Sequence, residues 1–129
     1  LMITKEAVEA FNTRLTVNLN NIKEMKPSEL DQVKNLGSQA EALLKNRELA
    51  FFIHQFKFEV ADSLTAISGH TPDDNSRRVA LTNQLSGIEE FIKSLQRCVF
   101  LKNRVVTQQT EPAPQHEEDL TNVRRTYHA

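Results

Sequence analysis

The residues of this sequence best suited to catalysis or metal binding are four histidines and a single cysteine, which are widely spaced along the chain. They are His54, His70, Cys98, His116 and His128. Helical enzymes with carboxylate-bridged metals carry Glu-x-x-His pairs, and no histidine here has a glutamate three positions before it. The sequence therefore predicts no catalytic, cofactor or metal site, and we expect a protein that is not an enzyme and has no small-molecule substrate.

Basic side chains offer a second kind of chemistry, the binding of phosphates. Glu89 and Glu90 interrupt the basic row, and 16 Lys and Arg balance 17 Asp and Glu over the whole chain, so its net field attracts polyanions weakly. The pattern favours a solvated helix face, and a small dimeric helical nucleic-acid-binding regulator is the alternative function. Five basic residues would contact the phosphates in that alternative: Arg77, Arg78, Lys93, Arg97 and Arg104.

Helical periodicity dominates the elements that would position these residues. The chain has 129 residues, three glycines and four prolines, which is typical of one domain built from long elements. Thr4 predicts the start of a first helix, which Pro27 would end near Met25. Its apolar residues recur at spacings of three and four: Val8, Phe11, Leu15, Leu19 and Ile22.

Two longer helices are expected to follow. A capping box at residues 28–31 predicts a second helix that runs to about residue 68, with Gly37 or residues 45–47 as places where it could break. Gly69 is expected to end it in a left-handed conformation, and Thr71 and Pro72 to start a third helix. That helix carries a heptad seam typical of coiled coils: Leu81, Leu85, Ile88, Ile92, Leu95 and Val99. A connection of two or three residues predicts an antiparallel hairpin that sets this seam against Ile53, Phe56, Val60 and Leu64.

The predicted fold class is all-α, a three-helix arrangement with a long antiparallel helical hairpin and an extended C-terminal arm. Residues 1–106 would form the hairpin or bundle domain. Residues 107–129 would form the polar arm, because the composition past Val106 shows two prolines and only scattered apolar residues. Part of the arm could fold on a partner as a short helix, and its docking residues would be Leu120, Val123, Arg124, Arg125 and Tyr127.

The second predicted helix is apolar on two sides. On a continuous helix Phe52, Ile53, Phe56 and Val60 share the side that faces the heptad seam. A monomeric bundle would cover the other side with the first helix, whereas an assembly would cover it with another subunit. The residues of that other side, expected to form an oligomer interface or to pack against a helix, are Val33, Ala40, Leu44, Phe51 and Phe58.

Residues 58–99 contain a helix end, a short polar loop with Pro and Asp, and a second helix in which Gly87 and Ile88 precede the apolar pair Phe91 and Ile92. In this, the segment resembles the small helical-hairpin proteins encoded among the head and packaging genes of tailed bacteriophages. The resemblance implies a virion or assembly component, such as a head–tail component, rather than a catalyst.

The chain shows no apolar run near the roughly 20 residues that span a bilayer and no visible secretory signal. With a single cysteine it can form no intramolecular disulfide. We therefore expect an intracellular or virion protein with no membrane partner. The function that the sequence favours is a non-enzymatic structural protein that forms a homo-oligomer or joins a larger assembly through apolar helix faces, and docks a partner with its C-terminal arm.

Overall fold

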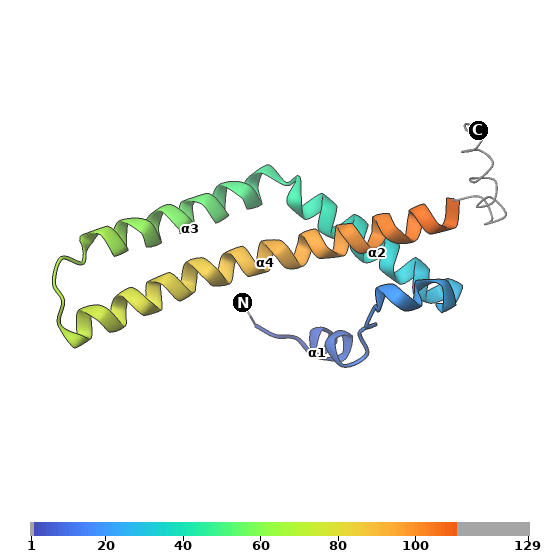
Figure 1. Cartoon of the computed structure of the whole chain (residues 1–129), viewed down its shortest axis with the longest axis horizontal. Helices are drawn as coiled ribbons and strands as arrows, with labels where there is room; N and C mark the ends of the chain where they lie inside the picture. Colours follow the sequence, from blue (N-terminus) through green and yellow to red (C-terminus); the bar gives the residue numbers. More distant parts are fainter. Residues whose placement is uncertain (1, 111–129) are drawn as a thin grey trace, which may run out of the picture.

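The computed structural model describes residues 2–110, which form helices grouped around one long C-terminal helix (Figure 1). Within this range there is no β-strand, which confirms the predicted all-α class. The residues of the predicted docking arm, Leu120, Val123, Arg124, Arg125 and Tyr127, lie outside the described residues. In order, the elements are α1 (Lys5–Asn12), the 3-10 helix η1 (Leu19–Glu24), α2 (Pro27–Leu44), α3 (Arg47–Ala66) and α4 (Pro72–Thr110).

The helix α4 is the element against which η1, α2 and α3 pack. Its 39 residues extend about 58 Å at 1.5 Å per residue, and α2, α3 and η1 all contact it. Figure 1 shows α3 antiparallel to the N-terminal part of α4, while α2 crosses its C-terminal part. The six residues of the predicted heptad seam are all partly buried, so this side of α4 faces the rest of the protein.

The best-buried apolar cluster lies where α2, η1 and the C-terminal part of α4 meet. Its centre is formed by Ile22, Val33 and Val105, and Val105 is fully enclosed. The partly buried residues packed around this centre are Leu15, Val17, Met25, Leu30 and Leu101. This end of the molecule therefore holds a three-element core, whereas α3 at the other end packs mainly on α4.

A two-residue interruption at Lys45 and Asn46 separates α2 from α3. The Oδ1 atom of Asn46 accepts a hydrogen bond from the Leu49 backbone N–H at 2.7 Å and so caps α3. One of the two predicted break points is thus confirmed. The other, Gly37, lies inside α2, and because the chain breaks at Lys45 and Asn46 an uninterrupted helix of about 40 residues does not form.

This interruption changes the helical phase of the chain. On a continuous helix Val33 and Ala40 would lie on the side opposite Ile53 and Val60. In the structure Val33 of α2 packs with Val105 of α4. The helix α3, which contains buried Val60 and partly buried Ile53, also packs on α4. The α2 part of one predicted stripe and the α3 part of the other therefore face the same helix.

The predicted first helix is too long. Thr4 caps it as expected, since its Oγ1 accepts a hydrogen bond from the Ala7 N–H at 3.1 Å, but α1 ends at Asn12. Leu15 and Val17 are partly buried against the core, and their spacing of two residues is typical of extended chain. Contacts with the core thus outweigh helical periodicity over residues 13–18. Along the predicted stripe, Val8, Phe11 and Leu19 remain exposed.

The start of α2 also differs from the prediction. The helix begins at Pro27, and the carboxylate of Glu29 accepts a hydrogen bond from the Lys26 backbone N–H at 3.0 Å. The predicted capping box at residues 28–31 is therefore placed two residues too late. Proline at the first helical position provides a suitable φ angle and removes an N–H that would have no partner in the helix.

The α3–α4 connection comprises residues 67–71 and is longer than predicted. No glycine in the described part of the chain has a positive φ, so the left-handed cap predicted at Gly69 is wrong. The Arg78 guanidinium instead donates hydrogen bonds to the carbonyl oxygens of Ile67 and Gly69. The predicted start of α4 is confirmed: Thr71 Oγ1 accepts from the Asp74 N–H at 3.1 Å, and Asp74 Oδ2 accepts from the Thr71 N–H at 3.2 Å.

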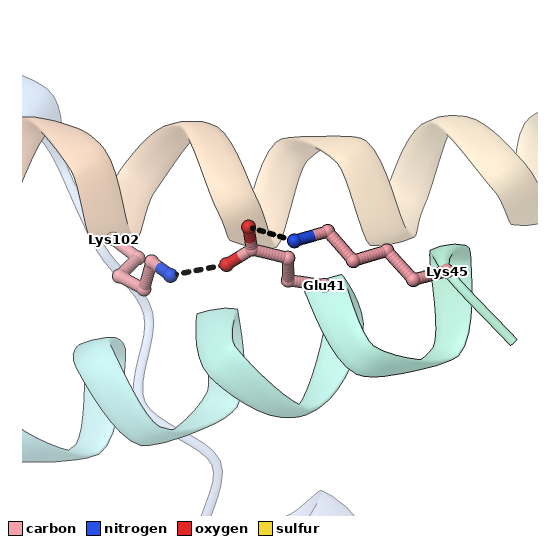
Figure 2. Close-up of polar contacts among 3 residues, drawn as sticks. All are labelled: Glu41, Lys45 and Lys102. Carbon is pink, nitrogen blue, oxygen red and sulfur yellow. Dashed lines mark hydrogen bonds and ion pairs between the residues drawn. The ribbon is translucent and has the colours of Figure 1, made fainter.

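Polar contacts between helices fix the position of α4 along its partners. Lys102 donates to Glu41 at 2.5 Å, and Lys45 lies 3.3 Å from the other carboxylate oxygen of Glu41 (Figure 2). On the α3 side, Lys57 donates to Glu89 at 2.5 Å. The hydrogen bonds from Lys102, and then from Lys45, lower the pKa of Glu41, and the hydrogen bond from Lys57 lowers the pKa of Glu89.

Gly37 marks the closest approach of α2 to α4. A Cβ atom at this position would overlap the Cβ of Lys102 and lie 2.7 Å from the carbonyl oxygen of Cys98. These neighbours belong to the α4 backbone and to the base of a side chain, which cannot rotate away. The glycine is therefore required by the short distance between the helices, and its φ angle is negative.

We expect Gly37→Ala to destabilise the protein by about 1–3 kcal/mol, because the added methyl group forces α2 away from α4. The matched control is Gly87→Ala, where an added Cβ has no neighbour within 4 Å. It should stabilise α4 by about 0.5–1 kcal/mol through helix propensity alone. Urea unfolding of both variants measures the difference, and equal shifts would contradict the close contact.

The lowered pKa of Glu41 predicts a pH-dependent contribution to stability. A carboxylate with a lowered folded-state pKa stabilises the protein above its unfolded pKa, and this contribution is lost as the pH falls through the folded value. The stability difference between wild type and Glu41→Gln should thus be largest near neutral pH and shrink below about pH 4.5. Urea unfolding from pH 7 to pH 3 measures it. Glu24→Gln, which removes a carboxylate without an ion pair in residues 2–110, is the matched control.

Candidate interaction surface

The five residues predicted to form an interface separate into two environments. Val33 and Ala40 of α2 are 5% and 3% exposed and are used in packing within the chain. Leu44 at the end of α2 is 36% exposed, whereas Phe51 and Phe58 of α3 are 62% and 69% exposed. The separation follows from the interruption at residues 45–46. Because of it, the α2 part of the predicted interface and the α3 part point in different directions.

Phe51 and Phe58 lie on the outer face of α3. Each residue advances about 100° around a helix, so these two, seven positions apart, lie within about 20° of each other. Val60, which is buried, lies on the opposite side of α3. A shallow hollow between the two rings is lined by Phe51, His54, Gln55, Phe58, Glu59 and Asp62.

A third phenylalanine extends this surface. Phe52 is 64% exposed, so its predicted place with the heptad seam of the third helix is wrong. Its ring contacts that of Phe51 edge to face, with centroids 5.4 Å apart and an interplanar angle of 77°. Phe56 is 37% exposed and lies at the margin of the α3–α4 contact. The aromatic surface thus covers the outer face and one flank of α3.

A second hollow lies at the α2–α3 junction and contains residues that the sequence reasoning did not assign to a site. Leu43, 44% exposed, lines it together with Leu44, Leu49, Ile92 and Leu95. His54 borders this hollow and the one between Phe51 and Phe58. The sequence contained one signal for this hollow, the predicted helix break at Lys45 and Asn46. A break leaves the apolar side chains at the two helix ends partly uncovered.

The basic row of the alternative function is only partly available to phosphates. Arg78 is occupied by the α3–α4 connection, where it donates to backbone carbonyls and to Asn75 Oδ1. Lys93 lies 3.5 Å from the carboxylate of Glu90. Helical geometry places Arg77 on the opposite side of α4 from Arg97 and Arg104. Three positions, Lys93, Arg97 and Arg104, remain on one exposed side.

The residues first considered for chemistry do not form a metal site in the described part of the chain. Among residues 2–110, no group of three or more His, Cys, Asp or Glu side chains is placed to hold a metal ion, and Cys98 is a partly buried thiol. His116 and His128 lie outside the described range. No helix in the same range is both long and apolar enough to cross a bilayer.

The aromatic surface of α3 is therefore the described feature on which a functional proposal can be based. Its residues are apolar and exposed, and their side chains offer contact area rather than reactive groups. Comparisons of the chain with protein-family models, with curated proteins and with solved structures found no match.

Proposed function

We propose that the protein is a non-enzymatic helical assembly protein that oligomerises through the outer face of α3. The observation that carries the proposal is the exposure of Phe51 and Phe58, 62% and 69%, on the side of α3 that faces away from α4. Single exposed apolar residues are common on protein surfaces. A contiguous surface of aromatic rings around a hollow, in contrast, is typical of an interface, where phenylalanine is enriched.

The monomeric bundle, the competing interpretation, has less support. It requires the first helix to cover the outer side of the second, but α1 has no buried residue. In Figure 1, α1 lies on the opposite side of α4 from α3. Phe11 of α1 is itself 61% exposed. The described part of the chain thus provides no helix that covers Phe51 and Phe58.

The proposal includes two features that come from the sequence. The first is a C-terminal arm that docks a partner through Leu120, Val123 and Tyr127, with Arg124 and Arg125 beside them. The second is a place in a phage particle or a head–tail component, which rests on the resemblance of residues 58–99. In this proposal the protein acts inside the cell or in the virion, and its contribution is the contact between subunits.

We expect the full chain at tens of micromolar to have a mass above that of one chain, measured by size-exclusion chromatography with light scattering. The double variant Phe51→Ser, Phe58→Ser should have the mass of one chain with unchanged helical circular dichroism, because both rings are exposed within the subunit.

The matched control is Phe91→Ser, Phe100→Ser, which removes two phenylalanines of α4 that are 45% and 50% exposed. It should leave the mass of the oligomer unchanged. A wild-type protein that has the mass of one chain at every concentration would overturn the proposed self-assembly. If the oligomer persists in the Phe51→Ser, Phe58→Ser variant, the interface does not lie on the outer face of α3.

A further inference from the structure

We propose that the outer face of α3 binds the same face of a second copy of this chain, antiparallel to it, about a two-fold axis between His54 and Gln55. Phe51 of each copy then packs beside Phe58 of the other, and Arg47 of each pairs with Asp62 of the other. The inference rests on the proposed function and adds to it the partner, the orientation and the register.

The order of residues along α3 carries the inference. Arg47, Phe51, Phe58 and Asp62 lie within about 60° of one another on the helix surface and form one strip. Phe51 and Phe58 lie at equal distances from the midpoint between residues 54 and 55, and so do Arg47 and Asp62. A two-fold contact uses the same patch on both subunits. This strip meets that condition, because reversing it places ring beside ring and charge beside charge.

The charges at the two ends select the antiparallel orientation. Arg47 and Asp62 have opposite signs, so antiparallel packing brings each beside its opposite in the other copy. Parallel packing in register would instead place arginine beside arginine and aspartate beside aspartate, which is unfavourable. The strip thus places its two aromatic rings between charged ends, and a charged rim around apolar residues is typical of protein interfaces.

The two charges have no ion-pair partner within residues 2–110. Both side chains belong to exposed residues, and fifteen positions of one helix keep them about 22 Å apart. They therefore cannot pair within one copy. A second copy in the proposed register supplies both partners at once.

The hollow between the two rings lies at the proposed axis and provides a place for the His54 and Gln55 side chains of the second copy. Its lining begins at Phe51, ends at Asp62 and contains both residues next to the proposed axis, His54 and Gln55. Helices pack by inserting side chains of one into gaps of the other. In the proposed register Phe51 and Phe58 of each copy border a gap that faces the corresponding gap of the other.

Charge reversal tests the pairing. Arg47→Asp and Asp62→Arg should each raise the dimer dissociation constant about tenfold, measured by analytical ultracentrifugation, because each replaces two ion pairs per dimer by two repulsions. The variant that carries both substitutions should return to within about threefold of wild type. Both substitutions suit the helix dipole, since the acid lies at the N-terminus and the base in the C-terminal third, so α3 should stay folded.

Disulfide trapping in a Cys98→Ser background tests the register. His54→Cys should form a disulfide-linked dimer on mild oxidation, because the two copies of this position lie about 1.5 Å apart along the axis. Arg47→Cys alone should not, since its two copies are about 22 Å apart along the axis, beyond the reach of a disulfide. Mixing Arg47→Cys with Asp62→Cys should give a linked heterodimer.

The outcomes separate the two proposals. A wild-type monomer overturns both. An oligomer that dissociates with Phe51→Ser, Phe58→Ser but is trapped by Arg47→Cys alone retains the proposed function and overturns the antiparallel register. A doubly charge-reversed chain as weak as either single variant overturns the pairing of Arg47 with Asp62. Two results together would overturn the inference: a dimer that is lost when residues 111–129 are removed, and a dissociation constant that does not respond to charge reversal. The C-terminal arm, rather than α3 of a second copy, would then be what binds the outer face of α3.

Discussion

The interruption between α2 and α3 determines which apolar residues of these two helices can be buried against α4. A straight helix of 40 residues could present only one of its two apolar stripes to α4. The two residues Lys45 and Asn46 let the chain change direction and phase, so α2 and α3 each place an apolar stripe on the same helix. The Asn46 cap stabilises this arrangement by about 1 kcal/mol, the usual value for such a side chain. Because α3 turns its other side toward α4, Phe51 and Phe58 are exposed on its outer face.

Packing within the chain is uneven, so the proposed association would also affect stability. In the described range the buried apolar residues are Ile22, Val33, Ala40, Val60, Ile67 and Val105, and most of them belong to the α2 end. The α3 end relies on a single helix pair. Chains of this size bury a modest fraction of their surface, and a contact made only by the folded state adds to the stability of that state. Burial of the aromatic surface would therefore stabilise the half of the molecule with the least core.

Local signals in the sequence predicted the parts of the fold that local contacts determine. The start of α4 depends on Thr71 and Asp74, which are three residues apart, and the break depends on Asn46 and its own first turn. Residues 13–18 could not be predicted in this way, because Leu15 and Val17 lie outside a helix and pack on a core built largely by distant residues. For the candidate site, helical geometry placed Phe51 and Phe58 on one side of a helix, and both are exposed on α3. The same geometry grouped Phe51 and Phe58 with Val33 and Ala40, because the helix was assumed to be continuous. No local sequence pattern shows how far a helix break rotates the chain.

The Arg78 contacts at the α3–α4 connection have a consequence for the order of folding. Arg78 binds carbonyl groups nine and eleven residues away in the chain. The next contacts along the hairpin join residues 32 apart, Lys57 and Glu89, and then 61 apart, Lys102 and Glu41. Closing a short loop costs less entropy than closing a long one, and local contacts favour rapid folding. The hairpin should therefore close from the Arg78 end, and α3 would be in place on α4 before α2 completes the core.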